Sequence, residues 1–94
     1  MLEAIALRKC VAATYNRGNV QLAPHIMYTR HDELYVDAVT IERDGRPPRE
    51  LKMSTFKLSG LHELAVAERP FDPEPIFDPS DEKYAGKTLF AVEV

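Results

Sequence analysis

Apolar positions along this 94-residue chain change their spacing from helical to strand-like within the first dozen residues. Residues 2–6 place apolar side chains three and four positions apart, which predicts a short helix that ends near Lys9. Residues 11–15 alternate instead, and the Asn and Gly residues within 16–19 are typical of a tight hairpin turn. The N-terminal part is therefore expected to run helix, strand, turn and strand.

The alternating pattern then continues through two longer strands. Residues 20–28 place apolar side chains mainly on one face, and Pro24 predicts either an edge position or a bulge in this strand. A polar turn at residues 30–33 leads into residues 34–42, which are rich in β-branched side chains and apolar on both faces. We expect residues 34–42 to form the strand in the middle of the sheet.

The second half adds shorter strands and an irregular arm. Residues 49–56 and 61–68 predict two further strands, and five short strands joined by short turns indicate a small barrel or a strongly curled antiparallel sheet. Four prolines within residues 70–79 rule out regular structure there, so this stretch is expected to be a linker or a wrapping arm. Residues 88–94 alternate cleanly, which predicts a final strand that either closes its own sheet or pairs with a second chain.

Composition excludes several classes of protein. An apolar fraction of 45% with 29% charged residues is typical of a chain that folds. The single cysteine, Cys10, excludes an internal disulfide and a structural zinc site, and it suits a reducing compartment. No apolar run approaches the roughly 20 residues that span a bilayer, and no signal-peptide pattern opens the chain. We therefore expect a cytoplasmic protein that does not insert into a membrane.

The net charge of −3 conceals an asymmetry. Up to and including Lys57 the chain has nine basic and seven acidic residues, whereas the remainder has three and eight. The first part is suited to attract an anion and the second to repel one. The acidic arm is therefore expected either to compete with an anionic ligand or merely to deliver the final strand. Its relevant carboxylates are Asp72, Glu74, Asp78, Asp81 and Glu82.

Enzyme signatures are absent from the sequence. His25, His31 and His62 lack the spacing that gathers metal ligands, and there is no phosphate loop, dinucleotide fingerprint or nucleophile elbow. Cys10 is expected to be a small buried hydrophobe, and Asp78 with Asp81 is expected to form turns or helix caps. We therefore predict no catalytic residue, no metal and no cofactor, and we do not expect an enzyme.

Aromatic and basic residues are interleaved along the predicted sheet. Cations that neutralise phosphates beside rings that stack on bases are the working parts of single-strand nucleic-acid binders. The alternative is that the rings belong to the core and the cations are solvated. The residues concerned are Tyr15, His25, Tyr28, Arg30, Tyr35, Lys52, Phe56 and Lys57.

The order of these features resembles the WYL domain, a bacterial Sm-like β-barrel usually found behind a DNA-binding helix-turn-helix. The segments Ala-Pro-His at 23–25, Leu-Tyr-Val at 34–36 and Phe-Lys-Leu-Ser-Gly-Leu at 56–61 are similar to family motifs. The resemblance covers residues 5–73 and implies an Sm-like barrel over residues 1–71, followed by an arm and strand at 72–94.

What the resemblance implies is a ligand-sensing or regulatory module linked to bacterial transcription. Its expected ligand is an anionic small molecule, a nucleotide or a short single-stranded nucleic acid. The alternative is a protein-interaction module that acts through sheet-edge pairing, including a homodimer formed through the C-terminal strand. The predicted ligand-binding residues are Tyr15, His25, Arg30, Tyr35, Lys52 and Lys57.

Overall fold

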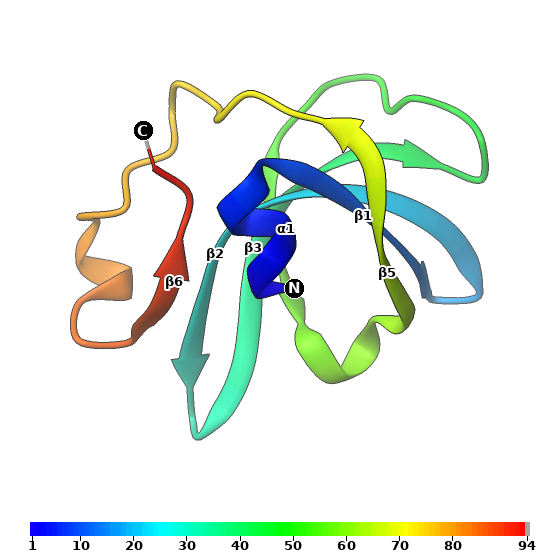
Figure 1. The fold of residues 1–94 in the computed structure, drawn as a ribbon. Helices are drawn as coiled ribbons and strands as arrows, with labels where there is room; N and C mark the ends of the chain where they lie inside the picture. Colours follow the sequence, from blue (N-terminus) through cyan, green and yellow to red (C-terminus); the bar gives the residue numbers. More distant parts are fainter. Residues whose placement is uncertain (94) are drawn as a thin grey trace.

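The computed structural model of the protein describes residues 1–93, which form a short helix and six strands (Figure 1). The helix α1 spans Leu2–Leu7, and the strands are β1 Lys9–Tyr15, β2 Gly18–Arg30, β3 Glu33–Arg43, β4 Met53–Lys57, β5 His62–Pro70 and β6 Thr88–Ala91. Two single-turn 3₁₀ helices, η1 Leu58–Gly60 and η2 Glu82–Tyr84, precede β5 and β6. The prediction of a mainly β chain with a short N-terminal helix is confirmed.

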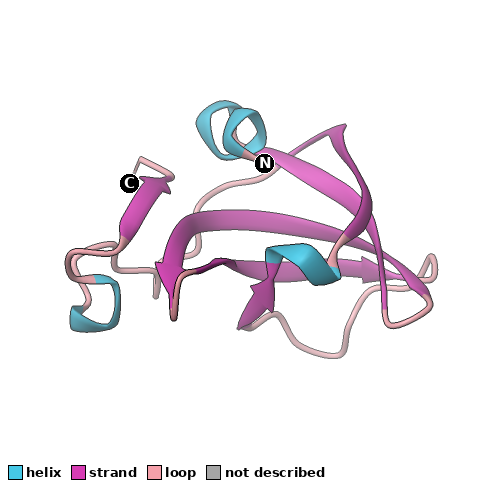
Figure 2. Cartoon of the chain, turned by 90° about the horizontal axis from the view of Figure 1, so that it is seen from below, coloured by secondary structure: helices cyan, strands magenta, loops and turns pink. Residues whose placement is uncertain are grey.

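The strands form one antiparallel sheet in the order β4-β3-β2-β1-β5, with β6 added beside β2. The outermost strands, β4 and β5, are not hydrogen-bonded to each other, so the sheet is curved but open (Figure 2). The expectation of a closed barrel is therefore wrong, and the curled antiparallel sheet is what forms. β4 has only five residues, and the pairing of β5 with β1 is interrupted by two register shifts, so these edges offer little regular backbone for closure.

The middle of the sheet is β2, not β3 as the sequence pattern predicts. β2 has 13 residues, which is long enough for β1 to pair with its first half and β6 with its second half along the same edge. β3 pairs along the other edge of β2 and separates it from β4. The register against β3 shifts between Pro24 and Ile26, so the predicted bulge is confirmed and the predicted edge position is wrong.

Local backbone geometry sets the boundaries of the elements. The helix ends two residues earlier than predicted, because Arg8 adopts a left-handed conformation with φ 55° and the next residue begins β1. Two-residue loops close both hairpins, with φ 47° and 62° at Asn16 and Arg17 and φ 51° and 63° at His31 and Asp32. Loops with two positive φ angles match the twist of the flanking strands, so both predicted turns are confirmed.

Two large apolar clusters and a smaller one, formed by Cys10, Ala23 and Val39, hold the sheet together. Val11, Leu22, Val36 and Phe56 belong to a cluster formed by β1, β2, β3 and β4. Fully burying a large apolar side chain contributes about 1.5–3 kcal/mol, so this cluster contributes substantially to the stability of the first four strands. Among residues 1–93, no helix is both long and apolar enough to cross a bilayer.

The C-terminal arm packs onto the sheet through the second cluster. Phe77, Tyr84 and Val92 are buried there against Ile5 and residues of β2. Residues 71–81 contain no helix or strand, which confirms the prediction of an irregular arm. The final strand pairs with β2 of the same chain, and the last residue of the predicted strand, Val94, lies outside the described residues. A domain boundary at residue 71 stays a prediction.

Candidate anion-binding site

Side chains of β2, β3 and β4 form two rows on one face of the sheet near the β2–β3 hairpin. Tyr28 lies opposite Tyr35, which in turn lies opposite Lys57. Two residues further along β3, Asp37 lies opposite Thr55. Directly opposed residues project to the same face, as do residues two apart in a strand, so all five side chains share one face.

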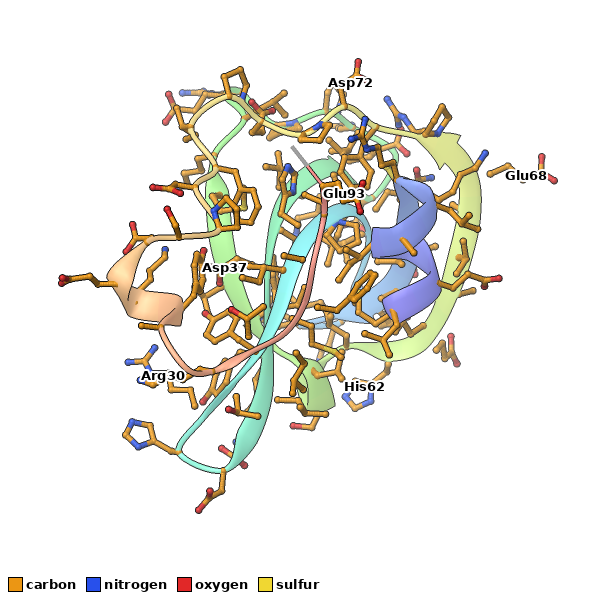
Figure 3. The ribbon with its side chains drawn as sticks, turned by 60° about the vertical axis from the view of Figure 1, so that its left-hand side comes forward. Arg30, Asp37, His62, Glu68, Asp72 and Glu93 are labelled. Atoms are coloured by element: carbon orange, nitrogen blue, oxygen red, sulfur yellow. The ribbon has the colours of Figure 1, made fainter. Side chains whose placement is uncertain are left out.

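The buried centre of this face is the carboxylate of Asp37, which is only 1% exposed. Its Oδ1 atom accepts hydrogen bonds of 2.7 Å from the hydroxyls of Tyr28 and Thr55. Its Oδ2 atom accepts a hydrogen bond from the hydroxyl of Tyr84 and lies 3.4 Å from Nζ of Lys83. Asp37 therefore ties the η2 segment of the arm to the sheet. Figure 3 shows Asp37 on the side of the sheet that faces η2.

The protonation states in this cluster follow from its contacts. Burial opposes ionisation of Asp37, but the hydrogen bonds from three hydroxyls and the charge of Lys83 outweigh it, so the pKa of Asp37 is lowered. An ionised carboxylate can only accept hydrogen bonds, so each hydroxyl donates its single proton to Asp37. Burial and the bond to Asp37 raise the pKa of Tyr28 to about 12 and also raise the pKa of Tyr84.

A hollow of about 300 Å³ adjoins this cluster and is lined by Tyr28, Arg30, Thr55, Lys83 and Lys87. Three of these five side chains are cations. Among the described residues, 1–93, no Asp or Glu side chain lines this hollow. Arg30 ends β2, at the tip of the hairpin seen in Figure 3. The backbone N–H of Thr29 donates to the carbonyl of Lys87 over 3.0 Å, which fixes Lys87 beside the same end of β2.

Three of the six predicted ligand-binding residues meet at this end of the sheet. The guanidinium carbon of Arg30 lies 5.9 Å from the centroid of the Tyr35 ring, within the range of a cation–π contact. Tyr35 is the direct neighbour of Lys57, whose Nζ lies 2.9 Å from Oε2 of Glu33. The hydrogen bond from Lys57 to Glu33 and the charge of Glu33 raise the pKa of Lys57. Arg30 therefore lines the hollow, whereas Lys57 is half of an exposed ion pair and lines a different hollow with Leu34.

Two other predicted residues lie away from the hollow. The ring of Tyr15 packs edge-on against Phe56, with centroids 5.1 Å apart and an interplanar angle of 80°, next to the other apolar cluster. Lys52 is exposed in the segment that precedes β4. The structure therefore does not bring these two residues together with Arg30 and Tyr35.

The remaining predicted residue, His25, is fully buried and holds the arm to β2. Its Nε2 atom accepts a hydrogen bond of 2.9 Å from the backbone N–H of Glu74, so the proton lies on Nδ1, which donates to the carbonyl of Ala23 over 2.8 Å. Burial lowers the pKa of His25 and outweighs the opposite effects of the Ala23 carbonyl and the Glu74 charge. His25 is therefore neutral at pH 7 and does not face the hollow.

A larger hollow of about 480 Å³ lies between the arm and the start of β1. Much of its lining is apolar, including Phe71, and its one cation, Arg69, is outnumbered by Asp72 and Glu74. Cys10 at its wall is buried, as expected, and burial raises the pKa of the thiol. This lining does not suit an anion, so the smaller cationic hollow is the better candidate site.

The arm contributes cations as well as carboxylates to the molecule. Asp78 accepts a hydrogen bond of 2.9 Å from the N–H of Ser80, and Asp81 accepts one of 3.0 Å from the N–H of Lys83. Both carboxylates thus form the turn and cap contacts predicted for them. The same arm supplies Lys83 and Lys87 to the hollow. Competition by the acidic arm stays a prediction.

Sequence reasoning missed most of the residues that build this site. Asp37 interrupts the apolar run of β3 between two buried neighbours, and a carboxylate in such a position signals a buried polar cluster. Lys83 and Lys87 stand in an acidic, irregular segment where a lysine is usually solvated, so no local pattern marks them. Only their contacts with β2 and β3 reveal their place.

Comparison with family models, curated proteins and solved structures finds no match for this chain. The resemblance to the WYL domain is therefore neither confirmed nor contradicted. Within the described residues, no group of three or more His, Cys, Asp or Glu side chains is placed to hold a metal ion. The site is defined by its own geometry alone.

Proposed function

We propose that this chain is a ligand-binding module that takes a phosphorylated anion, a nucleotide or a short single-stranded nucleic acid. The observation that carries the proposal is the meeting of Arg30, Lys83 and Lys87 around one hollow of about 300 Å³. Arg30 lies more than 50 residues from the two lysines in the sequence, so the fold itself brings it to them.

The cations suit a phosphate for different reasons. The planar fork of Arg30 can donate two parallel hydrogen bonds to one phosphate, and Lys83 and Lys87 act as point charges. All three residues are exposed, so their attraction for an anion is screened by salt. Binding is therefore expected to weaken steeply as the salt concentration rises.

The hydroxyls of the site favour binding over catalysis. Tyr28 and Thr55 both donate to Asp37, and the raised pKa of Tyr28 keeps its proton in place at neutral pH. The lowered pKa of Asp37 also makes this carboxylate a weak base, so it is poorly suited to take a proton from either hydroxyl and activate it as a nucleophile. Together with the resemblance to WYL domains, this supports a sensing or regulatory role, for which bacterial transcription is the working hypothesis.

The alternative function, protein interaction through a sheet edge, has weaker support. One edge of β6 is occupied by β2 of the same chain, and the pairing of β5 is disturbed by two register shifts. Bulges of this kind are a usual protection of edge strands against pairing with another chain. A homodimer through the C-terminal strand stays a prediction that light scattering tests.

The test is a binding titration with a fluorescently labelled uridine oligonucleotide at low and physiological salt. Lys83→Gln and Lys87→Gln should each weaken binding several-fold, and each should reduce the slope of log affinity against log salt by about 0.7. Lys52→Gln is the matched control, because Lys52 is also exposed but lies outside the hollow. Failure of the unaltered chain to bind at low salt, or equal losses in all three variants, would overturn the proposal.

A further inference from the structure

The hollow has donors and acceptors in separate places. A hydroxyl has one proton and two lone pairs, and the protons of Tyr28 and Thr55 both point to Oδ1 of Asp37. These two hydroxyls therefore offer only lone pairs to a ligand in the hollow. The side chains of Arg30, Lys83 and Lys87 are the opposite, because they carry only donors.

This separation bears on the chemical class of the ligand. A simple alkyl phosphate satisfies the three cations but leaves the oxygens of Tyr28 and Thr55 without a donor. A ligand that combines a phosphate with an alcohol O–H satisfies both sets at once. Leaving a buried acceptor unpaired costs free energy, so the mismatch discriminates between the two kinds of ligand. Tyr28 is 5% exposed, so its oxygen gains little from bulk water.

We propose that the hollow selects phosphate esters whose alcohol part carries free hydroxyls, namely a sugar phosphate or a ribonucleotide. This inference rests on the proposed function, since it requires that the three cations bind a phosphate. Thr55 is the specificity-determining residue, because it lines the hollow and its Oγ1 atom is held in place by the part-buried bond to Asp37. The hydroxyl of Tyr28, which also donates to Asp37, is a second acceptor at the same hollow.

The experiment compares ribose 5-phosphate with n-pentyl phosphate, which has the same number of carbons and the same charge but no hydroxyl. Calorimetric titrations of the full chain should give an affinity for ribose 5-phosphate about three- to tenfold higher, the effect of one hydrogen bond. A comparison of AMP with ribose 5-phosphate distinguishes a nucleotide from a free sugar phosphate as the ligand. Tighter binding of AMP than of ribose 5-phosphate identifies a nucleotide, and equal binding identifies a free sugar phosphate.

Two variants at one position isolate the cause. Thr55→Val keeps the shape of the side chain and removes the hydroxyl, so it should reduce the preference while n-pentyl phosphate still binds. Thr55→Ser keeps the hydroxyl and should retain the preference, and melting curves of both variants verify that they are folded. Equal affinities for the two phosphates in the unaltered chain would overturn the inference alone. Failure of both phosphates to bind would overturn the proposed function with it.

Discussion

Replacing Tyr84 by phenylalanine removes one hydroxyl that donates to Asp37 and leaves the ring in the core. Both residues are buried, with exposed fractions of 3% and 1%. A hydrogen bond to a charged group contributes about 1.5–3 kcal/mol, so Tyr84→Phe should lower the free energy of unfolding at neutral pH by about 2 kcal/mol. In a domain of this size that loss lowers the melting temperature by about 8–16 °C.

The effect of Tyr84→Phe should depend on pH with a definite sign. The pKa of Asp37 is lowered in the folded chain, so its ionised form stabilises the fold above the ordinary carboxyl pKa. That contribution is lost as the pH falls through the folded-state pKa. The difference between the unaltered chain and Tyr84→Phe should therefore be full at neutral pH and shrink below about pH 4.

Urea unfolding followed by circular dichroism measures this difference, and Tyr15→Phe is the matched control. Tyr15 is half-buried, and its hydroxyl makes no hydrogen bond within residues 1–93, so its removal should change stability by less than about 0.5 kcal/mol. Equal stability of Tyr84→Phe and the unaltered chain would refute the view that Asp37 anchors the arm. A similar loss in Tyr15→Phe would do the same.

Three further outcomes follow from the way the arm is held. Because burial lowers the pKa of His25, the fold should lose stability as the pH falls below about 6.5. The loss in the free energy of unfolding should reach up to about 1.4 kcal/mol per pH unit. Urea titrations at different pH values should show that His25→Gln removes this pH dependence. Phe77→Ala should cost about 3–5 kcal/mol in the same assay, since the ring is only 8% exposed within the second apolar cluster. Removal of everything after Pro70 should abolish cooperative thermal unfolding, and a truncated chain that melts cooperatively and binds polyanions more tightly would support competition by the acidic arm instead.

The parts of the fold that depend only on residues close together in the sequence could be predicted from it. Asn16 and the residues around it tolerate positive φ angles, and the turn falls there as expected. The bulge at Pro24 follows from the missing N–H of proline. Closure of the sheet depends instead on two edge strands that are adjacent in sequence but lie at opposite ends of the sheet order, and no local pattern specifies whether they meet.

The candidate site was predictable only in part, for the same reason. Arg30, Tyr35 and Lys57 belong to strands that pair across short or moderate loops, so their alternation brings them to one end of the sheet. Lys83 and Lys87 reach the same place only because distant contacts with Asp37 and Thr29 dock the arm there. His25 was predicted to bind the ligand because histidine often does so, but it is fully buried and instead stabilises the fold.

The most direct test of the central claim is a map of backbone amide chemical shifts during titration of the full chain with ribose 5-phosphate. Binding in the cationic hollow predicts that the largest shift changes cluster at residues 28–30, 55 and 83–87, and that they diminish with added salt. No shift change at millimolar ligand would contradict the claim. Changes centred instead on Cys10 and Phe71, in the larger apolar hollow, would contradict it as well.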